Sequence, residues 1–171
     1  MSLFRKDKES QAFWQEIYQR HYLRIYNTCL RIIGNSMDAE EAMHDTFLKI
    51  FDHMDHLQDE KAFYSWSQNI AVRTAIDRVR KKKPVFEPVD NLSIAVEEPD
   101  EEPELSVESI KREMNNLPEG YRIVLSMRLF EECEFEEIAQ ALKIKVSTAR
   151  SQYVRGRDKL AKILKSKIID Q

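Results

Sequence analysis

The stretch FEEIAQALKIKVSTARSQYVRGRDKL, residues Phe135–Leu160, decides the fold of the C-terminal part of this chain. Apolar or small residues recur in it every three or four positions, which is the spacing of a helix with one buried face. These residues are Phe135, Ile138, Ala139 and Leu142, followed by Val146, Ala149, Tyr153, Gly156 and Leu160. Only the three residues Lys143–Lys145 separate the two runs, and two helices joined by so short a turn are typical of a helix-turn-helix.

The second of these predicted helices carries a strong positive charge. Between Lys143 and Lys167 there are nine Lys or Arg residues and a single acid, Asp158, which gives a local charge of +8. The face turned away from the apolar stripe, with its flanks, presents side chains that can bond bases or phosphates: Ser147, Thr148, Arg150, Ser151, Val154, Arg155 and Arg157. Since the second helix of such a motif enters the DNA major groove, we expect these residues to bind DNA. The alternative is an ordinary basic surface helix.

The charge of the whole chain hides this basic segment. The 171 residues contain 30 acidic and 27 basic side chains, a net charge of −3. Residues 1–83 carry +2, residues 84–104 carry −8 and residues 105–171 carry +3. The middle segment holds four of the five prolines and no basic residue, a composition that does not easily bury itself. We therefore expect two small basic domains, 1–83 and 105–171, joined by a flexible acidic linker, 84–104.

Composition indicates that both domains are all-α. Three glycines in 171 residues leave few turns for a β-sandwich or barrel. No apolar run approaches the ~20 residues of a membrane span, so we expect no membrane insertion. The start, MSLFRKDKES, lacks the apolar core of a signal peptide, and Cys29 and Cys133 have no metal-type spacing. These features predict a soluble protein of the reducing cytoplasm.

Three helices are predicted in the first domain. The apolar spacing of residues 10–33 predicts a long helix that Gly34 and Asn35 end, with Ser36 capping the next helix. The buried stripe predicted for that second helix is Met43, Thr46, Phe47, Ile50, Phe51 and Met54. Its opposite face carries acids, and a charged face of this kind is usually only solvated.

The third predicted helix, residues 63–83, ends in five basic residues. Trp66, Arg73 and Arg80 are spaced seven apart, which places an aromatic ring and two cations on one helical face. That combination suits unstacked bases and phosphates. Two alternatives remain, namely a core position for Trp66 and basic residues that only complement the helix dipole.

Three segments resemble the extracytoplasmic-function (ECF) class of bacterial RNA polymerase sigma factors. They are DAEEAMHDTFLKIF (Asp38–Phe51), FYSWSQNIAVRTAIDRVRKK (Phe63–Lys82) and LPEGYRIVLSMRLFEECEFEEIAQALKIKVSTARSQYVRGRDKLAKIL (Leu117–Leu164). The resemblance covers nearly the whole chain, and the order and spacing of the segments make it specific. It implies a transcription initiation factor that binds core RNA polymerase, directs it to promoter DNA and assists promoter opening.

The resemblance also implies roles for individual residues. The residues facing the polymerase clamp would be Asp38, Glu41, Asp45 and Phe47. The residues at the promoter's minus-ten element would be Lys61, Phe63, Trp66, Asn69, Arg73 and Arg80. The seven residues named above for the last helix would read the minus-thirty-five element. An anti-sigma factor is a further partner expected for this class.

The chain departs from the pattern of the class at several positions. Lys143 stands where the turn usually has glycine, and a left-handed residue other than glycine costs about 1 kcal/mol. Gly156 stands in a helix where alanine is common, at a cost of about 1 kcal/mol. Residues 67–69 replace a more apolar and basic trio, and Arg73 replaces a frequent asparagine, which leaves the promoter sequence open.

Two other functions fit parts of the sequence. A stand-alone dimeric helix-turn-helix regulator would explain residues 105–171 but leaves residues 1–83 without a role. A metal enzyme would use His53 and His56, three residues apart, together with neighbouring aspartates. Neither a distant third ligand nor a phosphate-binding loop or nucleophile motif accompanies these histidines. We therefore predict no catalytic residue, no metal and no cofactor.

Overall fold

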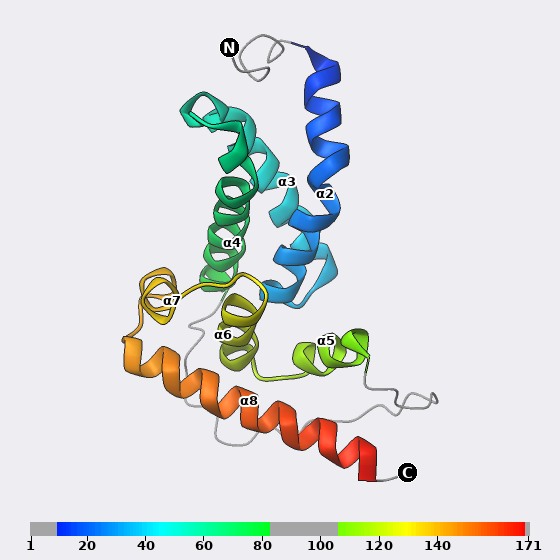
Figure 1. Ribbon diagram of the computed structural model, residues 1–171, viewed down its shortest axis with the longest axis vertical. Helices are drawn as coiled ribbons and strands as arrows, with labels where there is room; N and C mark the ends of the chain where they lie inside the picture. Colours follow the sequence, from blue (N-terminus) through cyan, green and yellow to red (C-terminus); the bar gives the residue numbers. More distant parts are fainter. Residues whose placement is uncertain (1–9, 83–105, 170–171) are drawn as a thin grey trace. The chain divides into compact units, whose positions relative to one another are not determined.

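The computed structural model describes residues 10–82 and 106–169, and within these ranges it is helical and contains no strand (Figure 1). The first three helices are α2 (Gln11–Ile33), α3 (Ser36–His53) and α4 (Phe63–Lys82), with the 3-10 turns η1 (Met54–His56) and η2 (Glu60–Ala62) before α4. The others are α5 (Val107–Asn115), α6 (Glu119–Leu129), α7 (Phe135–Leu142) and α8 (Val146–Ile169). The all-α prediction is confirmed, and the chain divides after Val79 into two compact units. The predicted linker, 84–104, lies outside the described residues.

The turn between α2 and α3 depends on Gly34. Its φ of 77° lies in the left-handed region, which glycine adopts without strain, and its N–H donates to the Leu30 carbonyl at 2.7 Å. The prediction that Ser36 caps α3 is wrong by one residue. Asn35 is the cap, because its side-chain oxygen accepts the Asp38 backbone N–H at 3.0 Å.

The N-terminal unit buries apolar residues from all three of its helices. Fully buried side chains include Ile25, Cys29 and Ile32 from α2, Ala39 and Ile50 from α3, and Ala71 and Ala75 from α4. Phe51, predicted in the buried stripe of α3, is only half-buried, and its ring centroid lies 4.5 Å from that of Trp14. This core determines which faces of α3 and α4 remain exposed.

Polar groups join α2 to α4, and Arg24 is their centre. The Arg24 guanidinium donates to Ser67 Oγ at 2.8 Å and to Gln68 Oε1, and it lies 4.2 Å from the centroid of the Tyr64 ring. Gln68 in turn donates to Thr28 Oγ1 at 2.6 Å. Ser67 and Gln68, which depart from the pattern of the class, are thus partners of an arginine on the neighbouring helix. We call these five residues the polar seam.

The predicted helix-turn-helix is present, since α7 ends at Leu142 and α8 begins at Val146. Lys143 has φ 55° and ψ 45°, the left-handed conformation expected where the class has glycine. The backbone N–H of Ile144 donates to the Ala139 carbonyl at 3.0 Å. This bond satisfies a carbonyl at the end of α7 and closes the turn.

Gly156 lies where α8 crosses α6. A Cβ at this position would lie 2.9 Å from Tyr121 Cβ and 3.2 Å from Leu125 Cδ1, which is closer than side chains normally approach. Glycine therefore lets the two helices come nearer than alanine would. The buried members of the apolar cluster around it are Met114, Leu117, Leu125 and Leu160. We call Gly156, Tyr121 and this cluster the apolar seam.

An ion pair joins α5 to the last turns of α8. Glu113 is only 4% exposed, and Lys167 Nζ donates to its Oε1 at 2.6 Å. Arg112 Nε lies 3.7 Å from the same oxygen. A buried carboxylate needs such partners, because removing one leaves an uncompensated charge away from water. The first and last described helices of the C-terminal unit are held together by this pair.

Candidate functional site

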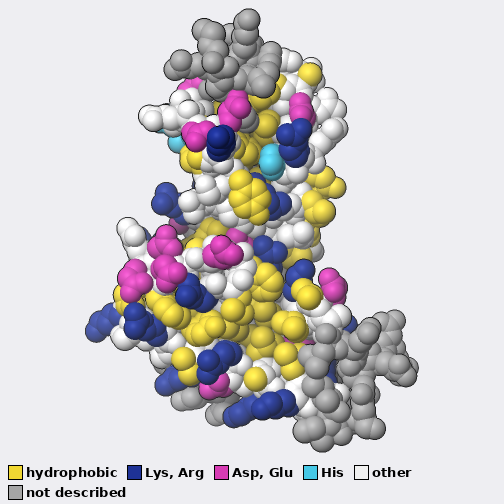
Figure 2. All heavy atoms as spheres, viewed as in Figure 1, with side chains coloured by type: hydrophobic (Ala, Val, Ile, Leu, Met, Phe, Trp, Pro, Cys, Tyr) yellow, Lys and Arg dark blue, Asp and Glu magenta, His cyan; other side chains and the backbone are white. Residues whose placement is uncertain are grey.

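One side of α8 is exposed and carries the side chains predicted to bind DNA. Ala149, Gly156 and Leu160 are buried on the other side of the helix. The exposed residues are Ser147, Arg150, Ser151, Val154, Arg155 and Arg157, and Thr148 is half-buried at their edge. Figure 2 shows basic side chains, in dark blue, along α8. The structure thus brings the seven predicted residues to the solvent side of one helix.

Two of the three arginines on this side have acidic partners. Arg150 Nη2 lies 3.4 Å from Glu136 Oε1 of α7, and Arg157 Nη2 lies 3.1 Å from Asp158 Oδ1 of the same helix. Within residues 10–82 and 106–169, no ion pair or hydrogen bond engages the side chain of Arg155. The three arginines therefore differ in how freely they can turn toward a ligand.

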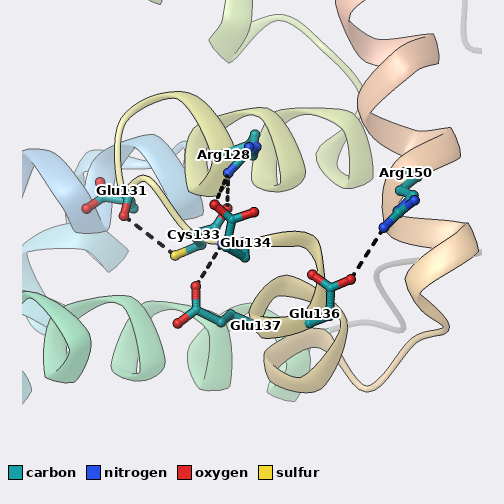
Figure 3. Close-up of polar contacts among 7 residues, drawn as sticks. All are labelled: Arg128, Glu131, Cys133, Glu134, Glu136, Glu137 and Arg150. Atoms are coloured by element: carbon teal, nitrogen blue, oxygen red, sulfur yellow. Dashed lines mark hydrogen bonds and ion pairs between the residues drawn. The ribbon is translucent and has the colours of Figure 1, made fainter.

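The amino end of α7 contacts both flanking helices through arginines (Figure 3). The guanidinium carbon of Arg150 lies 5.6 Å from the centroid of the Phe135 ring, and that of Arg128, from α6, lies 5.2 Å from the same centroid. Arg128 donates to Glu134 Oε1 at 3.0 Å, as Arg150 does to Glu136 at 3.4 Å. Phe135 is thus contacted by one arginine of α6 and by one arginine of the exposed side of α8.

Neither cysteine is an activated nucleophile. Burial, together with the nearby Glu137 and Glu131 carboxylates, raises the pKa of Cys133 to about 11. Cys29 is fully buried. A reactive thiol or a thiolate ligand needs both a lowered pKa and access to solvent. The pKa of Cys133 is raised, and Cys29 has no access to solvent.

The exposed stripe of α4 groups most of the residues predicted to hold single-stranded DNA. Asn69 and Arg73 are exposed, and Trp66 and Arg80 are half-buried on the same side of the helix. Asp77 also lies on this stripe and is exposed, so the surface is less basic than the sequence of cations alone indicates. An aromatic ring, an amide and two cations thus lie on one side of α4.

Phe63 does not belong to this surface. It is 5% exposed, and its ring centroid lies 4.9 Å from that of His21 and 6.0 Å from that of Trp66. A direct contact between Phe63 and a base is incompatible with this burial, so we correct its role to supporting Trp66. Lys61 is exposed in η2, where its backbone N–H donates to Asp59 Oδ1 at 2.9 Å.

Three acids of α3 converge on one arginine of α4. Arg78 lies 3.6 Å from Asp38 Oδ1 and 3.7 Å from Asp45 Oδ2, and it donates to Glu41 Oε2. The side chains of Glu41 and Asp45 remain more than half exposed. Sequence reasoning missed Arg78, because it counted this residue among the basic end of its helix. In the sequence, Arg78 has the helical spacing of the core-facing residues of α4. That spacing does not reveal which helix lies opposite this arginine.

Phe47, predicted on the same surface as these acids, is 2% exposed and packs against Tyr18 at 4.6 Å between ring centroids. It is a core residue, and we correct its predicted role. The exposed apolar side chains of α3 are Met37, at 71%, and Leu48, at 60%. Met37, Glu41 and Leu48 are four and seven residues apart, a spacing that places them on one face of the helix. From the sequence, this spacing alone could have identified Met37 and Leu48 as apolar residues on the same face as Glu41.

The described residues contain no group of three or more His, Cys, Asp or Glu side chains that could hold a metal ion. The rings of His53 and His56, which the alternative metal enzyme would use, lie 5.7 Å apart between centroids. In the part of the chain that the structure describes, no helix is both long enough and apolar enough to cross a bilayer.

Comparison with known proteins identifies relatives across the chain. The family models for Sigma-70 region 2 and for Sigma-70, region 4 match residues 17–85 and 108–160. The chain is 29% identical to the ECF RNA polymerase sigma factor SigW of Bacillus subtilis, with 92% of each protein covered. It is 31% identical to the RNA polymerase sigma factor SigZ of the same species, over 90% of this chain and 86% of that protein.

Two solved structures share the fold. One is the sigma factor RpoE in complex with the anti-sigma factor NepR from Bartonella quintana, with a TM-score of 0.56 and 19% identity over 88% of this chain and 96% of that chain. The other is CnrH in complex with the cytosolic domain of CnrY, with a TM-score of 0.53 and 17% identity over 96% of each chain.

Proposed function

This chain belongs to the ECF class of RNA polymerase sigma factors, which are transcription initiation factors, and on that premise we propose how its surfaces divide the work. α8 reads the minus-thirty-five element as duplex, the α4 stripe holds the minus-ten element as single strand, and α3 binds core RNA polymerase. Residues 1–83 and 105–171 form the corresponding domains, with 84–104 as their linker. The observation that carries the proposal is the exposed basic side of α8 in a helix-turn-helix.

The residues of α8 suit the major groove of duplex DNA. Arg150 and Arg155 project near the amino end of the helix, where they can bond a guanine edge with two hydrogens. Val154 is 44% exposed and can contact a thymine methyl group. Ser147 and Arg157 suit phosphate oxygens, which orient the helix without reading sequence.

The α4 stripe suits bases that have left the duplex. Moving a base out of the stack costs a few kcal/mol, about what a stacking surface returns. Trp66 offers its half-buried ring for that purpose, and Phe63 supports it from the core. Arg73 and Arg80 lie on the same stripe, where they can neutralise phosphates.

The exposed face of α3 suits a basic protein surface with an apolar centre. Glu41 and Asp45 supply the negative charge, and Met37 and Leu48 supply apolar area that a partner can cover. Arg78 holds the acids in a fixed arrangement, so fewer side chains need to be ordered on binding. We assign this face to core RNA polymerase.

Three further parts of the proposal concern setting and partners. Catalysis of RNA synthesis stays with the polymerase, and this chain contributes binding energy in the cytoplasm. An anti-sigma factor is a partner, as it is for the similar RpoE of Bartonella quintana. The stand-alone regulator is not favoured, because it leaves α2–α4 and the match of residues 17–85 without a role.

Run-off transcription tests the proposal. The full chain is mixed with bacterial core RNA polymerase and genomic promoter fragments, and we expect specific transcripts that neither component yields alone. The variant Glu41→Gln/Asp45→Asn should weaken core binding while leaving the binding of free chain to duplex DNA unchanged. Absence of specific initiation by the reconstituted holoenzyme would contradict the sigma-factor function. Tight, specific binding of the free chain to paired half-sites would instead support the dimeric regulator.

A further inference from the structure

We propose that Glu136, on α7, is a positioning residue that sets the base preference of Arg150 on α8. The inference rests on the proposed function, because it takes Arg150 to face the minus-thirty-five element. Glu136 itself would contact no base. Its carboxylate would hold one edge of the guanidinium and leave the other edge for DNA.

The geometry restricts Arg150 from two sides. Its Nη2 lies 3.4 Å from Glu136 Oε1 (Figure 3). Its guanidinium carbon also lies 5.6 Å from the centroid of the Phe135 ring. A guanidinium has five N–H donors in a planar fork, so one bond to a carboxylate leaves an edge with two donors free. The carboxylate and the ring together thus select an orientation of a side chain that would otherwise sample many rotamers.

The pair contributes little to folding, which makes a role in recognition easier to isolate. The side chains of Arg150 and Glu136 are 60% and 65% exposed, and exposed ion pairs of this kind add little to stability. Removing the carboxylate should therefore leave the fold intact. Its effect should be confined to what Arg150 does when DNA approaches.

Charge predicts the direction of that effect. DNA phosphates compete with base edges for any arginine on this side of α8, and a phosphate contact carries no sequence information. The Glu136 carboxylate repels phosphates and occupies the guanidinium edge that would reach them. It therefore lowers non-specific affinity and raises discrimination, which is how repulsive elements make an interface specific.

The neighbouring pair of Arg128 and Glu134 provides a matched control. Glu134 Oε1 lies 3.0 Å from Arg128 Nη1, and the Glu134 side chain is 64% exposed. The guanidinium carbon of Arg128 lies 5.2 Å from the centroid of the Phe135 ring. Arg128 belongs to α6 and not to the DNA-facing side of α8. Glu134→Gln therefore removes the same charge two residues before Glu136 and leaves the acidic partner of Arg150 in place.

The experiment measures promoter discrimination by the holoenzyme. Five full-length proteins are each assembled with core polymerase: the wild type, Glu136→Gln, Glu134→Gln, Arg150→Ala and the double variant Glu136→Gln/Arg150→Ala. Competition binding then uses a panel with every single base-pair change across the minus-thirty-five element. For Glu136→Gln we expect discrimination to fall about threefold to tenfold at the base pair that Arg150 reads, which lies at the low end of the coupling found between neighbouring side chains. Discrimination at the other base pairs should stay within about twofold, and binding to random duplex should tighten.

The remaining variants separate the possible failures. Glu134→Gln should leave every preference unchanged, and Glu136→Gln should have no further effect on base discrimination once Arg150 is alanine. If Arg150→Ala changes no preference, the proposed base contact of Arg150 is wrong and the inference fails with it. If Arg150→Ala relaxes one position while Glu136→Gln does not, or if the two effects simply add, the inference alone is overturned. Thermal unfolding by circular dichroism verifies that each variant is folded.

Discussion

Hydrogen bonds around one arginine join α2 to α4 in the N-terminal unit, whereas in the C-terminal unit α8 packs at Gly156 directly against the side chains of Tyr121 and Leu125 of α6. The polar seam places Arg24 within 2.8 Å of Ser67 Oγ and against the Tyr64 ring. The apolar seam has no room for a Cβ at Gly156. Each seam contains a departure from the pattern of the ECF class, so these departures are explained by packing between helices and need no role in DNA recognition.

The two seams should respond to different changes. A hydrogen-bonded seam is sensitive to the loss of a single partner, because the groups left behind are buried without one. A close-packed seam is sensitive to added volume. Both tryptophans, Trp14 and Trp66, lie in the N-terminal unit, so their fluorescence reports on that unit alone, and circular dichroism reports on both.

The largest effect is expected for Arg24→Met. The substitution keeps the length of the side chain but leaves Ser67 and Gln68 without their donor, at a cost of about 2 kcal/mol to the N-terminal unit. Urea unfolding followed by tryptophan fluorescence measures this loss. The matched control is Arg20→Met, which removes a largely exposed pair with Glu16 and should cost less than about 0.5 kcal/mol. Equal losses in the two variants would show that the seam contributes no more than a surface ion pair.

A smaller loss is expected for Gly156→Ala. Alanine gains about 1 kcal/mol in helix propensity, but its methyl group would displace Tyr121 or Leu125, at about 1–3 kcal/mol. The net result should be destabilisation of about 1 kcal/mol, seen by circular dichroism without an accompanying change in fluorescence. Ser151→Ala, at an exposed position of α8, should instead stabilise slightly. If Gly156→Ala stabilised the protein, the contact between α6 and α8 would accommodate a methyl group without displacing Tyr121 or Leu125.

Lys143→Gly should stabilise the C-terminal unit by about 0.5–1 kcal/mol, because Lys143 has a left-handed backbone that glycine adopts without strain. The measurement is the same urea titration by circular dichroism. Lys145→Gly, two residues further on, removes the same charge and should not stabilise. An unchanged midpoint for Lys143→Gly would show that the turn stores no backbone strain.

The smallest effect is a pH dependence confined to the N-terminal unit. Burial lowers the pKa of His21 below its usual value of 6.5, and the nearby Arg24 and Arg20 lower it further. The unfolded chain therefore binds a proton more readily than the folded one, so this contribution is present above about pH 6.5 and is lost as the pH falls. The fluorescence-detected midpoint should decrease between pH 7 and pH 5, and His21→Gln should remove that part of the decrease. An identical pH profile for the variant would contradict the assignment.

Features that depend on neighbours in the chain were predictable from the sequence. The boundaries of α7 and α8 follow from apolar spacing and from a turn of three residues. The left-handed Lys143 follows from the resemblance to a class that usually has glycine at that position. The choice between Asn35 and Ser36 as the cap of α3 was not, because both residue types accept such hydrogen bonds and stand side by side.

Features that depend on distant residues were not predictable. Arg78 meets Glu41 across 37 positions, and Arg150 meets Glu136 across 14. Periodicity places each residue on a face of its own helix but does not say which face lies opposite. For the same reason the burial of Phe47 and Phe63 was not predicted, because it depends on rings contributed by α2.

The ion pair between Glu113 and Lys167 has a practical consequence for work with this protein. Because Lys167 compensates a carboxylate that is 4% exposed, shortening the chain before this lysine leaves Glu113 with Arg112 alone. A C-terminal deletion chosen to aid crystallisation should stop after Lys167, so that α5 keeps its anchor.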